Sequence, residues 1–216
     1  MSINKNYAVF GLGRYGTAVA TELVRSGAEV IAVDKNEKLV AAAAPFVPLC
    51  KCADVTDPDV IKQLGIANVD VVIIAMASSL EATVMTIMLC KEAGVPEVVV
   101  KCGDEMHRKI FLRVGADQVV FPENESGTRL AKNLLSAGFV DMIELAENVS
   151  MVELDVKPEW VGKNLLELNL RKKYGINVVA IKRGKSVSTI IDPEVPFEAD
   201  MELIVIANTE KLGKVK

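Results

Sequence analysis

Residues 7–34 of this chain read YAVFGLGRYGTAVATELVRSGAEVIAVD. An apolar run, YAVF, leads into the glycine pattern GLGRYG, then into a helical stretch that extends to about Ser26, and then into a second apolar run, EVIAVD. Apolar runs bounded by turn residues are typical of buried strands, and the segment between them has the period of a helix. The stretch therefore predicts a strand, a tight turn, a helix and a second strand.

The glycine pattern fits GxGxxG, which alone is weak evidence because glycines also mark ordinary turns. Its context is more specific, since it follows an apolar strand, opens a helix and precedes Asp34 at the end of the next strand. In a nucleotide-binding turn, Gly11 permits the tight turn, Gly13 lets the backbone approach a phosphate, and Gly16 allows close packing of helix on strand. The helix N-terminus attracts the negative charge. We therefore predict a bound adenine nucleotide whose ribose hydroxyls donate hydrogen bonds to Asp34.

The alternation of strand and helix continues to about residue 122. Runs such as VDVVIIAM, apolar on both faces, indicate strands covered by helices on both sides of a parallel sheet. The further expected strands span residues 49–54, 69–76, 95–101 and 118–123, and the further expected helices span residues 37–44, 58–64, 80–93 and 106–114. With about six strands, this half is expected to be a Rossmann-like, doubly wound parallel sheet of the α/β class.

The second half of the chain changes pattern. Residues 126–145 begin with Ser126, Gly127 and Thr128, residue types that cap helices, and continue with leucines among small residues. We expect a helix here, and periodicity leaves open whether it covers the sheet or crosses over to pack on a second subunit. The expected organisation is a Rossmann domain over 1–125, a crossover helix or linker over 126–145, and a small α+β C-terminal domain over 146–216.

The composition limits the classes of function. Half of the 216 residues are hydrophobic, a quarter are charged, and the formal net charge is −4. Nucleic acid is excluded as a partner because no basic stripe is available to neutralise phosphates. The mean hydropathy is +0.29, but the longest apolar run, residues 71–77, is far shorter than the about 20 residues of a spanning helix. We expect a cytoplasmic homo-oligomer, since an interface is the ordinary place for surplus apolar surface.

Other polar residues follow the strand ends, where ligands of doubly wound sheets bind. Asp34, in place of arginine or serine, disfavours a 2′-phosphate, so NADP is the least favoured dinucleotide. Arg14 lies at a helix N-terminus, where a cation opposes the helix dipole, and a terminal phosphate that meets its guanidinium resolves this conflict. Further strand ends fall at Asp54, residues 75–79, Lys101 and Glu123.

The sequence lacks the residues expected of an enzyme. A dehydrogenase needs an acid or base beside the nicotinamide, and the one histidine, His107, falls in an expected helix and is predicted to be a surface residue. The four cysteines are too few and too irregularly spaced for a disulfide framework or a CxxC zinc site, and we expect them to be buried and reduced. We therefore expect no enzymatic activity. The alternatives are a small NAD-dependent oxidoreductase, a redox-sensing regulator and, against the acidic balance, a DNA-binding redox repressor.

Longer motifs match one family over essentially the whole chain. They read AVFGLGRYG, VIAVDKNE, VVIIAMASSLEAT, VVKCGDEMHRKIFLRVGAD and FPENESG in the first half, and NLRKKYGINVVAIKRG and DMELIVIA in the second. The order and spacing of these motifs are much more specific than GxGxxG alone. The chain resembles the KtrA/TrkA-type regulatory subunits of bacterial potassium-uptake systems, which carry RCK N-terminal and C-terminal domains.

This resemblance implies a gating subunit that responds to nucleotides. Members of the family bind ATP, ADP or NAD(H), form rings that are octameric among the KtrA proteins, and dock beneath a membrane potassium-translocating subunit of the KtrB or TrkH type. The corresponding expectation is a cytoplasmic protein held at the inner face of the cell membrane through that partner. Nucleotide exchange then changes the shape of a ring built from dimers.

The resemblance also assigns roles to residues of the first half. The glycine loop binds the phosphates, Asp34 binds the ribose and Asp54 the adenine edge. Arg14 contacts the γ-phosphate of ATP in its own or a neighbouring subunit, Lys101 lies near phosphate, and Glu123 helps to bind Mg²⁺ or another cation. Residues 75–78 lack the glycine that the family commonly has, which leaves the choice between ATP and NAD open. The implied nucleotide-binding set is Gly11, Leu12, Gly13, Arg14, Tyr15, Gly16, Asp34, Lys35, Asp54, Val55, Ala75, Met76, Ser79, Lys101 and Glu123.

The second half resembles the RCK C-terminal domain, which in Gram-positive relatives binds cyclic di-AMP across its dimer interface. Arg171 is then expected to pair with phosphate, and aliphatic residues are expected to cover the adenine faces. The alternative is that Leu170 and Val178 are core residues and that Arg171 is a solvated helix end. The implied positions are Asn169, Leu170, Arg171, Asn177, Val178 and Pro193.

Overall fold

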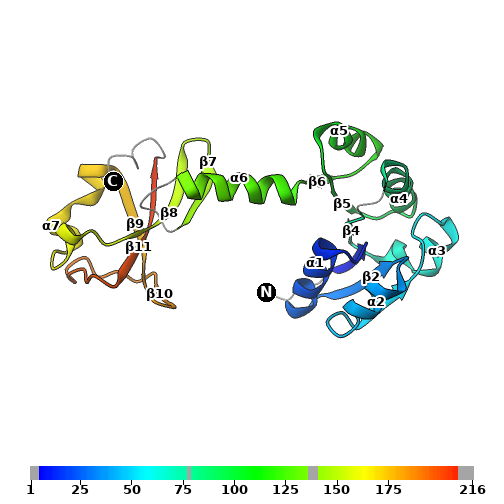
Figure 1. The fold of residues 1–216 in the computed structure, drawn as a ribbon, viewed down its shortest axis with the longest axis horizontal. Coiled ribbons are helices and arrows are strands. Elements are labelled where there is room, and N and C mark those ends of the chain that lie inside the picture. Colours follow the sequence, from blue (N-terminus) through cyan, green and yellow to red (C-terminus); the bar gives the residue numbers. More distant parts are fainter. Residues whose placement is uncertain (1–4, 77–78, 136–140, 209–216) are drawn as a thin grey trace. The chain divides into compact units, whose positions relative to one another are not determined.

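The structure is a computed structural model that describes residues 5–76, 79–135 and 141–208. The chain divides into two compact units, Met1–Asn124 and Glu125–Lys216. Figure 1 shows helices packed around the sheet of the first unit, whereas the second unit consists mainly of strands.

The first unit contains a six-stranded sheet in the order β3-β2-β1-β4-β5-β6, and every neighbouring pair of strands is parallel. The doubly wound, Rossmann-like fold predicted from the sequence is therefore confirmed. Its elements are β1 (Asn6–Phe10), α1 (Arg14–Arg25), β2 (Glu29–Asp34), α2 (Glu37–Ala43), β3 (Leu49–Cys52), α3 (Pro58–Gln63), the 3₁₀ turn η1 (Ile66–Asn68), β4 (Val71–Ile74), α4 (Leu80–Glu92), β5 (Glu97–Lys101), α5 (Glu105–Val114) and β6 (Gln118–Val120).

Helices cover both faces of this sheet, because successive residues of each strand point to opposite sides. In β1, Ala8 and Phe10 belong to the core formed with α3, α4 and α5, whereas Val9 belongs to the core formed with α1 and α2. Burial on both faces explains why the strands are almost continuously apolar. The helical residues that complete the two cores are Ile61, Ile87, Cys90 and Phe111 on one face and Ala20 and Ala43 on the other.

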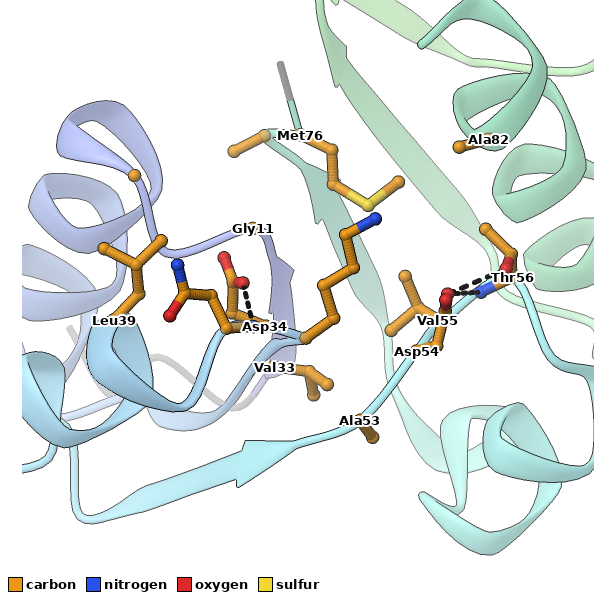
Figure 2. Close-up of a pocket in the computed structure, with 14 residues that line it drawn as sticks. Gly11, Val33, Asp34, Leu39, Ala53, Asp54, Val55, Thr56, Met76 and Ala82 are labelled. Carbon is orange, nitrogen blue, oxygen red and sulfur yellow. Dashed lines mark hydrogen bonds between the residues drawn. The ribbon is translucent and has the colours of Figure 1, made fainter. Parts of the chain in front are cut away.

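The strand order reverses at β1, which pairs with β2 on one side and with β4 on the other. The connections leaving β1 and β4 therefore diverge, which opens a crevice at the carboxyl edge of the sheet. Figure 2 looks into a cavity at this edge, between the ends of β1, β2 and β4.

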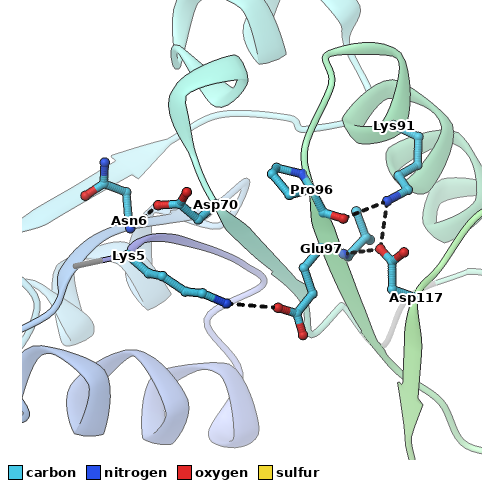
Figure 3. A network of polar contacts seen from close by, with 8 residues as sticks. Lys5, Asn6, Asp70, Lys91, Pro96, Glu97 and Asp117 are labelled. Carbon is cyan, nitrogen blue, oxygen red and sulfur yellow. Dashed lines mark hydrogen bonds and ion pairs between the residues drawn. The ribbon is translucent and has the colours of Figure 1, made fainter. Parts of the chain in front are cut away.

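A lysine-centred network fixes the opposite edge of the sheet, at the start of β5 and β6 (Figure 3). Lys91 Nζ lies 2.7 Å from Asp117 Oδ2 and also contacts the carbonyl oxygens of Val95 and Pro96 at 3.3 and 3.2 Å. The Val98 N–H donates to the same carboxylate at 2.7 Å. Burial raises the pKa of Asp117, but the hydrogen bonds from Lys91 and Val98 outweigh this effect and leave the pKa below its ordinary value.

We expect Asp117→Asn to destabilise the first unit at neutral pH. Because the pKa of Asp117 is lower in the folded chain, its contribution is present above the unfolded value of about 3.9 and is lost as the pH falls through the folded value. The side chain is 42% exposed, so solvent screening limits the loss to about 1 kcal/mol or less. The measurement is the hydrogen-exchange protection factor of Val98, lower than wild type at pH 7, with a deficit that shrinks as the pH falls below the unfolded pKa of about 3.9. A deficit of the same size at neutral and acidic pH would contradict a charge effect.

The second unit contains a five-stranded antiparallel sheet in the order β10-β9-β11-β8-β7. Its core gathers Trp160, Leu168, Phe197 and Leu203, all buried. The predicted small α+β domain is therefore confirmed as a fold. Its elements are β7 (Asp141–Ala146), β8 (Val149–Asp155), the 3₁₀ turn η2 (Pro158–Trp160), α7 (Leu165–Leu168), α8 (Leu170–Tyr174), β9 (Ile176–Arg183), β10 (Ser186–Ser188) and β11 (Met201–Asn208).

The prediction of a helix over residues 126–145 is wrong at both ends. Helix α6 spans Pro122–Leu135, so Ser126 and Thr128 lie inside it and do not cap it. Pro122 suits the first helical turn because its fixed φ is already helical and its missing N–H has no partner to lose. Glu123, expected at a strand end, belongs to the first turn of this helix.

Residues 141–145 form part of strand β7, where a helix was expected. Ile143 pairs with Met151 of β8, and Ile143 and Leu145 alternate at the strand period of two. Residues 136–140, the middle of the expected helix, lie outside the described residues. Leu130 and Leu134 of α6 are 60% and 75% exposed.

Two expectations drawn from composition can be compared with the described residues. Among them, no helix has the length and apolar character needed to cross a membrane. Cys90 and Cys102 are buried and Cys50 is half-buried, but Cys52 is exposed. The expectation of buried thiols is therefore wrong for Cys52, because β3 is an edge strand of the sheet.

Candidate functional site

The turn between β1 and α1 is closed by two glycines in close contact. Gly11 has a φ of +95°, and its N–H donates to the carbonyl oxygen of Val33 at 2.8 Å. A Cβ on Gly11 would lie 2.9 Å from backbone atoms of Ala75 and Met76, and a Cβ on Gly16 would lie 1.9 Å from the Gly11 carbonyl oxygen. We call the turn Gly11–Gly16 the glycine elbow. Only glycine at both positions lets α1 start this close to β1.

Gly13, unlike Gly11 and Gly16, lies beside open space. A Cβ at this position would have no heavy atom within 4 Å, and Gly13 lines the cavity of Figure 2. Gly13 is also the N-cap of α1, where it offers no capping side chain, and the first turn of α1 carries no acidic residue. A 12-residue helix therefore begins at the cavity with a positive dipole end that an anion can meet.

Gly13 and Gly16 give a matched test of this geometry. We expect Gly16→Ala to destabilise the first unit by several kcal/mol, because the added methyl group meets a backbone oxygen that cannot move aside. We expect Gly13→Ala to fold as stably as wild type but to weaken nucleotide binding, because its methyl group takes up the space of a phosphate. Thermal unfolding and calorimetric titration with ADP measure the two effects. Equal ADP affinity in wild type and Gly13→Ala would contradict the role of Gly13.

Asp34 and Asp54 are held by backbone donors at neighbouring strand ends. Asp34 Oδ2 accepts the Leu12 N–H at 2.6 Å, and Asp34 Oδ1 accepts the Asn36 N–H at 2.8 Å. Asp54 Oδ1 accepts the Thr56 N–H at 3.0 Å and the Thr56 hydroxyl at 2.7 Å. These bonds from Thr56, the backbone one first, lower the pKa of Asp54, so the group is ionised at neutral pH. Each carboxylate oxygen keeps lone pairs for a ligand hydroxyl or amine.

The first cavity has a volume of about 370 Å³ and lies over β1, β2 and β3 (Figure 2). Val33, Leu39 and Val55 give it apolar walls, and the two aspartates stand at its polar side. A flat apolar ring with a polar sugar suits such a lining. The predicted residues on this cavity are Gly11, Gly13, Asp34, Lys35, Asp54, Val55, Ala75 and Met76. Sequence reasoning did not include Val33, Asn36, Leu39, Ala53, Thr56 and Ala82.

A second cavity of about 480 Å³ lies beside the ends of β4, β5 and β6. Lys101 Nζ lies 2.6 Å from Glu123 Oε1, and this bond, together with the nearby charge of Arg14, lowers the pKa of Glu123. Lys101 Nζ also lies 5.8 Å from the centre of the Tyr15 ring. The predicted residues on this cavity are Met76, Ser79, Lys101 and Glu123, and those missed include Cys102, Asp104, His107, Phe111 and Phe121.

The remaining residues of the predicted nucleotide set line neither cavity. Leu12 is buried, and its N–H donates a hydrogen bond to the Asp34 carboxylate. Gly16 packs closely against the carbonyl oxygen of Gly11. Arg14 is exposed and Tyr15 is half-buried. His107 was expected on the surface, but it is half-buried, with Nδ1 2.7 Å from Asp104 Oδ2 at the second cavity.

In the second unit, the cyclic di-AMP positions divide into exposed and buried residues. Asn169 joins α7 to α8 in the left-handed conformation, with a φ of 47°. Arg171, Asn177 and Pro193 are exposed. Leu170 is 2% exposed and belongs to the core, and Val178 is half-buried against it, as the alternative reading had it. The described residues contain no cluster of three side chains able to hold a metal ion, and Glu123 is paired with Lys101.

A Rossmann-like unit with a glycine elbow and an acidic residue at the end of β2, followed by an antiparallel α+β unit, defines the class of this protein. The family model of the TrkA-N domain matches residues 7–122, and that of the TrkA-C domain matches residues 149–216. The chain belongs to the TrkA/Ktr family of potassium-uptake proteins.

Relatives in this family align along nearly the whole chain. The Ktr system potassium uptake protein C of Bacillus subtilis is 39% identical over 215 residues, which cover 98% of this chain and 96% of the relative. The Ktr system potassium uptake protein A of the same organism is 36% identical, with 88% and 86% covered. The protein A of Vibrio alginolyticus is 34% identical, with 97% and 96% covered.

Solved structures share the fold at lower identity. The GsuK channel superposes with a TM-score of 0.54 at 21% identity, covering 98% of this chain and 38% of the channel, so this chain spans less than half of that protein. The TrkA-N domain of the inner membrane protein ybaL from Escherichia coli has a TM-score of 0.54 at 14% identity, covering 62% of this chain and 99% of that one.

Proposed function

We propose that this protein is a nucleotide-binding regulatory subunit of a potassium-uptake system and not an enzyme. The observation that carries the proposal is the first cavity, where the glycine elbow, the start of α1 and Asp34 surround about 370 Å³ of space. The relatives named as Ktr system potassium uptake proteins support the process in which it acts.

The ligand class follows from the lining of that cavity. An adenine ring fits between the apolar walls at Val33 and Val55, and Asp54 faces its polar edge. The ribose meets Asp34, and the phosphates meet Gly13 and the start of α1. ATP, ADP and NAD(H) share this adenosine phosphate part. A structurally similar channel, GsuK, is described as bound to NAD.

The proposed mechanism is a change of shape driven by differential binding. A ligand shifts a two-state equilibrium only by its affinity ratio between the states, and such couplings are typically about 1–3 kcal/mol per site. The coupling free energies of several sites in one ring add together. The partner is a membrane potassium-translocating subunit of the KtrB or TrkH type, which holds the protein at the cytoplasmic face of the membrane. An octameric ring built from dimers is the proposed assembly.

The direct test of this proposal is calorimetric titration of the purified chain with ATP, ADP and NADH. We expect saturable binding of at least one of them with one site per chain. A parallel assay follows NADH oxidation with added carbonyl substrates, and we expect no turnover. Absence of binding by all three ligands would contradict the proposal, and measurable hydride transfer would favour the rival oxidoreductase.

Arg14 provides the contact that distinguishes ATP from ADP. Its side chain is exposed at the first residue of α1, next to Gly13, and this position at the start of the helix supports a contact with a terminal phosphate. We expect Arg14→Ala to weaken ATP binding about tenfold relative to ADP binding, as measured by calorimetry. An equal loss of affinity for ATP and ADP would contradict this role. Binding of Mg²⁺ or another cation at Glu123 is tested separately, by repeating the titration with EDTA.

We also propose that the second unit binds cyclic di-AMP through Asn169, Arg171 and Asn177, all exposed near α8 and the start of β9. We expect Arg171→Ala to weaken cyclic di-AMP binding about tenfold, because the guanidinium pairs with a phosphate of that ligand. We expect ADP binding to stay unchanged. Calorimetry measures both affinities. Unchanged cyclic di-AMP affinity in this variant, or no binding by wild type, would leave the second unit as a dimerisation domain.

A further inference from the structure

The two cavities are neighbours at the carboxyl edge of the sheet. The first cavity lies at the ends of β1, β2, β3 and β4, and the second lies at the ends of β4, β5 and β6. Within the described parts of the chain, Met76 is the one residue that lines both cavities. A ligand long enough to occupy both must therefore pass Met76.

The backbone of Met76 is fixed in place. The N–H of the preceding residue, Ala75, donates to the carbonyl oxygen of Phe10 at 2.7 Å. The Met76 nitrogen lies 2.9 Å from the position that a Cβ on Gly11 would take, so the end of β4 is pressed against the glycine elbow. The backbone that enters Met76 is therefore held by a hydrogen bond and by close packing.

The side chain of Met76, in contrast, has rotatable bonds. It is half-buried, packs against the core on the α3, α4 and α5 face, and points into the first cavity in Figure 2. Its three rotatable bonds and thioether let it fill an irregular gap. The Met76 side chain therefore occupies the space between the two cavities, while the backbone that carries it is held in place.

The second cavity has a lining suited to a second ring. Cys102, Phe111 and Phe121 give it apolar surface, whereas Ser79, Lys101 and His107 are polar. A mononucleotide in the first cavity leaves this surface uncovered, and a dinucleotide places its second ring and sugar there.

We propose that the Met76 side chain separates the two cavities and thereby selects mononucleotides over dinucleotides. This inference rests on the proposed nucleotide-binding function and names the ligand class that the site prefers. Because the adenosine half of both ligands occupies the same cavity, any contact of Met76 with that half is common to both ligands, and only the second half of the dinucleotide separates their affinities.

The test compares ADP and NADH by calorimetry in wild type, Met76→Ala and Met76→Leu. In wild type we expect ADP to bind about tenfold more tightly than NADH, the discrimination that a few methylene groups produce in a pocket. In Met76→Ala this ratio falls about tenfold, because the cavities join, and any change in the contact with the shared adenosine half cancels in the ratio. Met76→Leu keeps the bulk and the wild-type ratio, and its thermal unfolding serves as the folding control.

Each outcome separates this inference from the proposed function. Binding of NADH as tight as ADP in wild type would overturn the role of Met76, even if Met76→Ala did not fold. A ratio unchanged between wild type and a folded Met76→Ala would overturn it as well. Failure of every nucleotide to bind wild type would instead remove the proposed function on which the inference rests.

Discussion

The structure depends on the close approach of Gly16 to the carbonyl oxygen of Gly11, where a Cβ would lie only 1.9 Å away. This approach lets α1 begin directly at the end of β1 and brings the positive end of its dipole to the carboxyl edge of the sheet. Asp34 reinforces the arrangement by accepting the Leu12 N–H. One turn therefore sets both the start of α1 and the position of the Asp34 carboxylate.

The charges at the second cavity link ligand binding to the helix that follows the sheet. Glu123 lies in the first turn of α6 and pairs with Lys101 at the end of β5. The division between the two units falls inside α6. Under the proposed function, a ligand phosphate that competes for Lys101 would change the charge balance at the start of that helix, which offers a physical route from nucleotide identity to subunit conformation.

Local patterns in the sequence, together with the family resemblance, predicted the Rossmann-like sheet and eight of the fourteen residues on the first cavity, because GxGxxG, the spacing to Asp34 and the strand ends are short-range signals. The second cavity was largely missed, since Phe111 and Phe121 have the pattern of ordinary core residues and meet only when β5 and β6 align. Strand β7 was missed because a short alternation at Ile143 and Leu145 also fits the end of an amphipathic helix. The first miss arises because residues of separate elements meet only in the folded sheet, and the second arises from a local pattern that fits two structures.

We propose that the glycine elbow holds the phosphates of an adenine nucleotide. Hydrogen exchange of the full chain with and without ADP tests this proposal, because the amides that contact the ligand report their own protection. We expect slower exchange at residues 11–16 together with residues 34–36. Unchanged exchange at residues 11–16 under saturating ADP would show that the elbow does not hold the phosphates.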